Sequence, residues 1–569
     1  MSVEIFFTGG IYLPNQDSEN EEDFRLTLGK IYNPGEDRYS AALVKVANNP
    51  EILNNLESDL SMAYFFARKN SLRLIRDACG ISPLFYARRP DGGWAFAFSL
   101  DILFRLLGFT PPMDEATFYD FTATHYRHVF RDPGRTFHQG VRQVPAGSYV
   151  DISADGPAER RWLNLAFDPK VAAMSPQEAS ERYVSQLDQS VKIRLKALKG
   201  EEIGFTVSSG MDSPSVAALA ARELGKPLKV WYVAYDDQAQ SPYDETAGVK
   251  ALVKGTGWKL HRVNLAAPDL LFETKSLMEL VKAPMVTVTW LAHFVMAKKV
   301  KQAGIDYLFS GLGGDESLAG EFEHFFVFFA DLLASGQTEL LAKETEAWIR
   351  LHDHPEFKKS AKVRDEWIKR NCDLTTGEIF VDKTRYTAVR SWFNPEWVEA
   401  REAAAPPVPM PRPYPYFLSN RLFQEMSYET SPPTLWSEAL SSQAALIQGV
   451  FPMTSLGCLI AALSAPGTSK YENGVTKMLL RRAMKGILPD SARLNPVKTG
   501  FNAPLDLWLR DKKLSGDCRD LLLSTKFRSL GWINRTSINK IFDEHLSGQR
   551  NHMMLLWPLI STALFLDLK

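Results

Sequence analysis

The spacing of apolar positions divides the chain into two parts with different periodicity. Up to about residue 160, short apolar runs alternate with turn residues, as at Asn70–Ser71. The runs are Val3–Phe7, Met62–Phe66, Leu72–Arg76 and Trp94–Phe98. Short strands joined by turns are typical of a layered β or α+β domain, which we predict for this first part.

From about residue 161 onward, strand-like and helical stretches alternate. A helical period over Pro176–Leu198 comes first. Two strand-like runs, Leu228–Tyr235 and Leu260–Leu265, are each followed by a helical stretch, Glu245–Val253 and Val295–Ala303. This βαβα order predicts a doubly wound parallel sheet, in which ligands bind beyond the carboxyl ends of the strands. The loops after the strands are therefore the candidate binding site.

One of these loops has the composition of an anion-binding site. Residues 205–214 read Phe-Thr-Val-Ser-Ser-Gly-Met-Asp-Ser-Pro and lead into the helical run Val216–Leu224. Small side chains let backbone N–H groups approach a phosphate, and a helix start with Pro214 in its first turn adds a positive dipole end. The loop lacks the Gly-Lys-Ser/Thr ending of a Walker motif and contains a carboxylate, Asp212, instead. A carboxylate beside a phosphate implies Mg²⁺.

Two motifs in this order resemble the asparagine synthetase family. Residues 208–213 are similar to its Ser-Gly-Gly-x-Asp-Ser pyrophosphate loop, with Ser209 in place of the first glycine. Residues 310–316, Ser-Gly-Leu-Gly-Gly-Asp-Glu, resemble its Ser-Gly-x-Gly-Gly-Asp-Glu motif. A closing series over residues 476–510 resembles its Thr-Lys-x-x-Leu-Arg, Leu-Pro, Lys-x-Gly-Phe and Pro-x-x-x-Trp-Leu elements. In the first part, residues 76–86 and 136–147 resemble elements of the family's glutaminase domain.

The resemblance implies a two-domain α/β protein. Residues 1–160 would form a degenerate glutaminase-like domain with a layered α+β, Ntn-hydrolase-like fold. Residues 161–569 would form a PP-loop ATP-binding synthetase domain on a doubly wound parallel sheet, with a helical insert over Glu321–Tyr428. We expect this insert to shape the entry of the substrate. An ordinary helical subdomain, with all of its aromatic residues in the core, explains the same sequence at least equally well.

The resemblance also implies ATP and Mg²⁺ as cofactors and assigns residues to them. Asp212 and Asp315 would bind the metal, although two aspartates alone could equally be helix caps. Lys498 would stabilise charge in the transition state, and Lys477 would support the leaving pyrophosphate. The positions assigned to ATP are Val207, Ser208, Ser209, Gly210, Asp212, Ser213, Val233, Ser310, Gly311, Gly313 and Gly314.

Composition narrows the class of partner. The 569 residues are 45% hydrophobic with a net charge of −1, so no overall basic field points to nucleic acid or to an anionic membrane. The four cysteines are scattered without a CxxC pair, which fits reduced thiols better than disulfides or a zinc site. The longest apolar window, Leu277–Ala297, contains charged residues and a proline, and the N-terminus lacks a signal pattern. We expect a cytoplasmic protein without membrane or nucleic-acid partners.

Several departures from the family pattern argue for a different nitrogen source and substrate. An N-terminal glutaminase needs a thiol after removal of Met1, and this chain has Ser2. The stretches with which the family holds glutamine are missing. Gln448 falls where the family has a glutamate that handles the incoming amine, and an amide cannot accept its proton. This leaves the catalytic base unassigned.

The sequence therefore predicts an ATP-dependent ligase that adenylates a carboxylate, releases pyrophosphate and joins the acyl group to an amine. Without a glutaminase, the amine would belong to the substrate itself, as in the family's lasso-peptide macrolactam cyclases and β-lactam synthetases. We favour the lasso-type cyclase, whose partners would be a short-peptide carboxylate substrate with its own amine and a precursor-processing protease.

Three alternatives stay open on the sequence. A synthetase could use ammonia, or glutamine, to amidate aspartate or a related small carboxylate. A nucleotide-binding scaffold without catalysis would keep the same fold, but the joint presence of Asp212, Asp315 and Lys498 argues against it. A tRNA-modifying enzyme with a similar loop is disfavoured by the neutral charge and the unpaired cysteines.

Overall fold

The computed structural model describes residues 10–13, 23–34, 39–239, 241–351, 358–379, 390–404, 410–429, 431–496 and 502–568. Ser2, the predicted strand Val3–Phe7 and the predicted catalytic Lys498 lie outside these ranges.

Two antiparallel sheets form the first part of the chain. One sheet has the order β2-β3-β4-β8-β9 and the other the order β1-β6-β5-β7. The strands of the first are β2 (Phe24–Leu28), β3 (Ser61–Phe66), β4 (Ser71–Ile75), β8 (Ser148–Ser153) and β9 (Gly156–Arg161). Those of the second are β1 (Gly10–Leu13), β5 (Phe85–Arg88), β6 (Trp94–Ala97) and β7 (Val141–Gln143). The strands expected near residues 62, 72 and 94 are thus confirmed.

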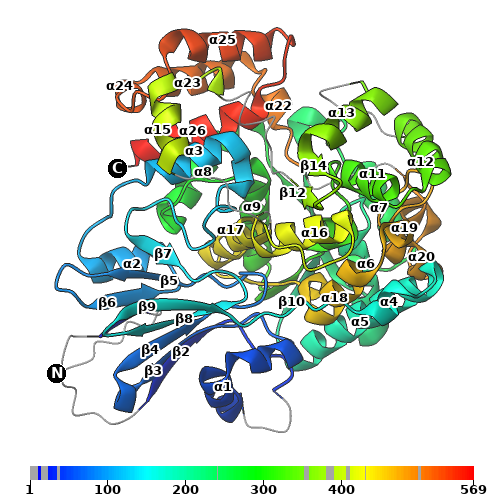
Figure 1. Cartoon of the computed structure of the whole chain (residues 1–569), viewed down its shortest axis with the longest axis horizontal. Helices are drawn as coiled ribbons and strands as arrows, with labels where there is room; N and C mark the ends of the chain where they lie inside the picture. Colours follow the sequence, from blue (N-terminus) through cyan, green and yellow to red (C-terminus); the bar gives the residue numbers. More distant parts are fainter. Residues whose placement is uncertain are drawn as a thin grey trace.

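The two sheets pack face to face between helices. Leu74 and Val150 of one sheet meet Phe96 of the other in a shared apolar core. Helix α1 (Tyr39–Asn48) covers the outer face of the first sheet, and α2 (Leu100–Leu107) covers that of the second. Figure 1 shows these layers at the lower left. The arrangement is the layered Ntn-hydrolase-like fold expected from the sequence.

The second part is built on a five-stranded parallel sheet. Its order is β12-β11-β10-β13-β16, and every neighbouring pair is parallel. The strands are β10 (Ile203–Thr206), β11 (Lys229–Ala234), β12 (Lys259–Asn264), β13 (Tyr307–Phe309) and β16 (Gln448–Val450). Along β11, Val230 and Tyr232 face one apolar core while Trp231 and Val233 face another, so both faces of the sheet are buried.

Helices cover both faces of the parallel sheet, as the predicted doubly wound architecture requires. One face carries α5 (Pro176–Ala197), α6 (Asp212–Leu224), α7 (Thr246–Val253), α18 (Leu456–Ser464) and α20 (Met478–Ala483). The other carries α8 (Leu270–Val281), α9 (Val288–Gln302), α17 (Ser431–Ala444) and α26 (Met553–Asp567).

The predicted insert is helical. It contains α11 (His324–Ala334), α12 (Thr338–Leu351), α13 (Ala361–Asn371), α15 (Pro395–Ala404), α16 (Phe417–Ser427) and the small ladder of β14 (Cys372–Asp373) and β15 (Glu378–Ile379). The aromatic side chains of α11, such as Phe326 and Phe329, are buried against Trp348. These aromatic residues therefore serve as core, which was the simpler of the two readings of the sequence.

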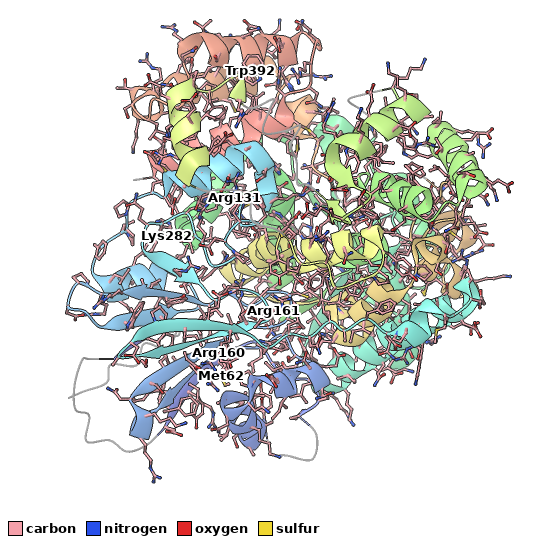
Figure 2. All side chains as sticks on the ribbon, viewed as in Figure 1. Met62, Arg131, Arg160, Arg161, Lys282 and Trp392 are labelled. Carbon is pink, nitrogen blue, oxygen red and sulfur yellow. The ribbon has the colours of Figure 1, made fainter. Side chains whose placement is uncertain are left out.

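The C-terminal helices pack against the first part. They are α22 (Leu505–Trp508), α23 (Lys512–Leu523), α24 (Thr525–Arg528), α25 (Arg535–Leu546) and α26. Trp532 stacks on Trp397 of α15 at 4.9 Å between ring centroids and contacts Phe118 of α3 (Glu115–Thr124). In Figure 2 Trp392 marks this region at the top, where its ring meets that of His552.

Buried ion pairs join the two parts. Arg194 of α5 contacts Glu57 at 2.6 Å and Asp59 at 3.3 Å. A cation–π contact adds to them: Arg161, the last residue of β9 and labelled in Figure 2, lies over the ring of Phe423 of α16. These contacts place the first part of the chain directly against the second.

All four cysteines are buried and unbridged. Across the described ranges, no helix combines the length and apolarity that a membrane crossing requires.

Candidate active site

The anion-type loop joins β10 to α6. The strand ends at Thr206 and the helix begins at Asp212, so the carboxylate stands at the first helical position and not inside the loop. Ser213 Oγ accepts a hydrogen bond of 3.0 Å from the Ser208 N–H, and Ser208 Oγ accepts one of 3.3 Å from the Gly210 N–H. The small hydroxyl residues therefore set the conformation of the loop.

The second glycine-rich loop, between β13 and α10 (Gly314–Leu318), is pressed against the first. A Cβ added at Gly311 would overlap the backbone nitrogen of Ser213, and one added at Gly314 would overlap the Asp212 carboxylate carbon. The glycines are thus required by the close approach of the two loops. The two motifs, which lie far apart in the sequence, form one structure.

Lys477 connects the two loops electrostatically. Its Nζ lies 2.6 Å from Asp212 Oδ2 and 2.7 Å from Asp315 Oδ1. The residue precedes α20 with a left-handed backbone, φ +57°, and its side chain is buried. Burial by itself would lower the pKa of the ammonium, but the two carboxylates outweigh it and raise the pKa above its ordinary value. Lys477 is therefore charged at neutral pH.

A cavity of about 120 Å³ opens beside these groups. Its lining includes Val207, Ser208, Gly210, Asp212, Ser213, Ser310, Gly311, Gly313, Asp315 and Lys477, all of which the sequence singles out. Within the described ranges, Ser209, Gly314 and Val233 are not part of this lining. Ser209 turns toward α7, Gly314 lies behind Asp212, and Val233 is buried in the core under α9.

Two carboxylates near the loops have strongly raised pKa values. Glu245, next to the start of α7, accepts a hydrogen bond of 3.1 Å from Ser209 Oγ, and burial raises its pKa to about 7. Glu316 lines the cavity, where burial and the neighbouring Asp315 raise its pKa to about 8. Clusters of perturbed groups of this kind are typical of functional sites.

The sequence assigned no role to three titratable residues of the cavity wall, His293, Glu316 and Glu321. His293 lines the cavity from α9, and its Nδ1 lies 2.7 Å from Glu438 Oε2 of α17. Both side chains are buried. The only available signal was a single histidine in an otherwise apolar helical run, a pattern that a structural core histidine also produces.

The donor set of the two loops fits Mg²⁺ and no larger metal centre. Among the residues that the structure describes, no group of three or more His, Cys, Asp or Glu side chains could hold a metal ion by itself. Mg²⁺ is usually bound by one or two carboxylates together with the phosphates of a nucleotide. Asp212 and Asp315, which share one ammonium group, are such a pair.

Gln448 lies away from this cavity. It begins β16 in register with Tyr307, at the opposite end of the strand from the loops. With Asp59 and Ser82 it lines a second cavity of about 420 Å³ between the two parts of the chain. The glutamine that stands here in place of the family's glutamate therefore belongs to the cavity between the two parts of the chain. The titratable groups beside the two loops line the other cavity.

The hairpin of residues 76–86 in the first part satisfies its own polar groups. The Arg76 guanidinium donates to the carbonyl oxygens of Gly80 and Val144, and Asp77 accepts from the N–H groups of Ile81 and Ser82. Burial lowers the pKa of Arg76 to about 10, which still leaves it charged. These side chains stabilise the hairpin.

Comparison with known proteins gives two family matches. The asparagine synthase model matches residues 182–567, and the glutamine amidotransferase domain model matches residues 42–163. A Mycobacterium bovis protein provisionally named a glutamine-hydrolyzing asparagine synthetase is 23% identical, covering 90% of this chain and 76% of the relative. Asparagine synthetase 1 of Bacillus subtilis is 19% identical over 75% of this chain and 65% of its own length. The amidase chyE of Penicillium rubens is 25% identical, covering 50% of this chain and 42% of the relative.

Proposed function

We propose a function for this chain from one premise: it belongs to the asparagine synthase family. It is accordingly an ATP-dependent carbon–nitrogen ligase acting on a carboxylate and an amine. We propose that it activates the carboxylate as an acyl-adenylate, with release of pyrophosphate, before the amine attacks. We also propose two domains, residues 1–160 and 161–569.

The observation that carries the proposal is the meeting of Asp212 and Asp315 at Lys477 Nζ. Two phosphate-type loops that present paired carboxylates beside one buried cation can hold a polyphosphate through its metal. When bound, Mg²⁺ would neutralise phosphate charge, and Asp212 and Asp315 would be its protein ligands. We assign Ser208 and Ser213 to the pyrophosphate, and Lys477 to the charge that grows on it as it leaves.

Lys498 completes the proposed machinery. It belongs to the Lys-x-Gly-Phe element, and we assign it to the charge that develops at the reacting carboxyl carbon and phosphate in the transition state. Val207 and Val233 are assigned to the adenosine. For Val207 this agrees with its place in the cavity lining.

For the amine, we propose a group carried by the substrate itself, and hence formation of a macrolactam in a short peptide. Ser2 replaces the thiol that a glutaminase of this type uses. Arg76 and Asp77 are bonded to their own hairpin, so they contribute to the fold instead of a glutamine site. A protease that releases the peptide would be the corresponding partner.

A second candidate is a synthetase that uses ammonia, or glutamine, to amidate aspartate or a related small carboxylate. It is consistent with the names of the M. bovis and B. subtilis relatives, which are those of glutamine-hydrolyzing asparagine synthetases. The two candidates share the adenylation step and differ in the acceptor.

One experiment tests the shared step and separates the candidates. The protein is incubated with ATP, Mg²⁺ and either L-aspartate plus ammonium or a short peptide with a free N-terminal amine and an internal Asp. We expect AMP and pyrophosphate by phosphorus NMR. Loss of water from the peptide by mass spectrometry supports the cyclase, and asparagine supports the second candidate. Stoichiometric ADP would contradict adenylation.

A further inference from the structure

His293 is an unusual residue for its helix. From Val288 to Ala297, α9 is buried on nearly all sides, and its other side chains there are almost all apolar. The imidazole is only 5% exposed. Burying a titratable side chain in such a setting costs free energy, because the side chain loses its hydrogen bonds to water, unless a polar partner replaces them.

Glu438 of α17 is that partner. Its Oε2 lies 2.7 Å from His293 Nδ1, and the carboxylate is itself only 3% exposed. The two helices pack side by side. A buried carboxylate this close to one imidazole nitrogen restricts the orientation of the ring. The pair thus has the composition of a general base with its orienting acid.

The pair also has access to the reacting groups. The ring of His293 forms part of the wall of the cavity that Asp212, Asp315 and Lys477 line. Nδ1 faces Glu438, so Nε2 is the nitrogen through which the ring would exchange a proton with a molecule in the cavity.

Four other acidic groups line the cavity. Asp212 and Asp315 are held by Lys477, so they are less suited to accept a proton. Glu316 and Glu321 are the remaining competitors in the wall.

We propose that His293, oriented by Glu438, is the general base of amide formation in this protein. This rests on the proposed adenylation. The amine nitrogen forms a bond to the acyl carbon and gives one proton to His293 Nε2. The acyl carbon–oxygen bond to AMP then breaks, and AMP leaves with the electron pair. The products are the amide, AMP and an imidazolium paired with Glu438, which later returns its proton to water.

The test separates activation from transfer. Exchange of pyrophosphate into ATP reports adenylation. We measure this exchange with three carboxylate substrates: L-aspartate, L-glutamate, and a short peptide with a free N-terminal amine and an internal Asp. The carboxylate that gives the fastest exchange is then used with two acceptors. Ammonium must lose a proton before it attacks, whereas hydroxylamine is largely unprotonated at neutral pH and needs little help from a base.

For His293→Gln we expect exchange within a few-fold of the parent, amide formation from ammonium lower by about a hundredfold or more, and a much smaller loss of hydroxamate formation. Retained exchange also shows that the variant is folded. Glu438→Gln should lower transfer to ammonium in the same selective way. The matched control is His552→Gln, which breaks another His–Glu pair: His552 is buried, its Nε2 lies 2.6 Å from the partly exposed Glu544, and the pair is outside the cavity. It should leave both steps unchanged.

Other outcomes overturn the inference. Transfer to ammonium within a few-fold of the parent in His293→Gln would show that another group is the base. A parallel fall of exchange and transfer would show that His293 acts in binding. The selective loss in Glu316→Gln or Glu321→Gln, and not in His293→Gln, would identify that carboxylate as the base. If the parent itself shows no exchange with any of the carboxylates, the proposed function fails, and the inference fails with it.

Discussion

Asp212 and Asp315 lie in the first turns of two different helices, α6 and α10, and share one ammonium group, the Nζ of Lys477, at 2.6 and 2.7 Å. Asp212 is the first residue of its helix and Asp315 the second of its own. Each helix follows the carboxyl end of a parallel strand. In the absence of nucleotide, the lysine compensates negative charge that would otherwise be buried. The site is therefore both an element of stability and a preformed place for a cation.

Replacing Lys477 with methionine should destabilise the protein. It leaves two adjacent, partly exposed carboxylates without their cation, so the cost should lie below the roughly 3–5 kcal/mol of breaking a fully buried ion pair. Thermal unfolding should shift to lower temperature, and added Mg²⁺ should recover more stability in the variant than in the parent. The control is Lys485→Met, at an exposed position, which should change neither. An unchanged melting temperature in Lys477→Met would contradict the shared ion pair.

The contact between the loops predicts a strong effect of one methyl group. In Gly314→Ala the new Cβ would overlap the Asp212 carboxylate carbon, so we expect a loss of about 1–3 kcal/mol and weakened ATP binding. Gly516→Ala is the matched control, because Gly516 lies in α23 with open space around it, and alanine should stabilise that helix slightly. Calorimetry of ATP binding and thermal unfolding measure both effects. Equal behaviour of the two variants would refute the close contact.

Glu316 should make stability depend on pH. Burial and Asp315 raise its folded-state pKa to about 8 from an ordinary value of 4.5, so the folded state holds this proton more tightly than the unfolded state does. The stability contributed by the bound proton is full below pH 4.5 and is lost as the pH rises through 8, by an amount on the order of 5 kcal/mol.

The variant Glu316→Gln tests this dependence. Since a neutral amide cannot ionise, the fall in melting temperature between pH 5 and pH 8 should be smaller than in the parent. Glu181→Gln, on an exposed face of α5, is the control and should keep the slope of the parent. A slope in Glu316→Gln identical to that of the parent would speak against a buried protonated acid.

Variants at Lys498 and at Asp212 should lose different steps of the reaction, turnover in the first and nucleotide binding in the second. Lys498→Ala should lower amide formation by about a hundredfold to a thousandfold with ATP affinity largely kept, because its proposed partner is charge that develops only in the transition state. Asp212→Asn should weaken binding of ATP with Mg²⁺ itself. Single-turnover rates and nucleotide affinity separate the two. Product formation within a few-fold of the parent in Lys498→Ala would show that its role has been assigned to the wrong residue.

Glutamine should not serve as a nitrogen donor. The missing thiol at Ser2 and the self-bonded Arg76 and Asp77 predict that glutamine yields no more glutamate with ATP and the acyl substrate than without them. Enzymatic assay of glutamate measures this. Release that is stimulated by the acyl substrate and abolished in Ser2→Ala would reverse the conclusion.

The sequence by itself determined the fold class and the two loops. Small residues and glycines after apolar runs predict a βα turn whatever the rest of the chain does, because the requirement for space is local. The parallel sheet was predictable as well, because strand-like and helical periods of apolar residues alternate along this part of the chain. The helix of α6 begins earlier than its apolar run suggests, at Asp212, because propensity marks helix interiors better than helix ends.

Only the tertiary structure decided which polar residues share a cavity. Lys477 reaches both loops from a distant segment, and His293 meets Glu438 across two helices, which no spacing within either segment reveals. It also separated Gln448 from the loops by placing it at the opening residue of β16. The physical reason is that such contacts depend on how helices pack across a sheet, whereas periodicity reports only which side of each element is buried.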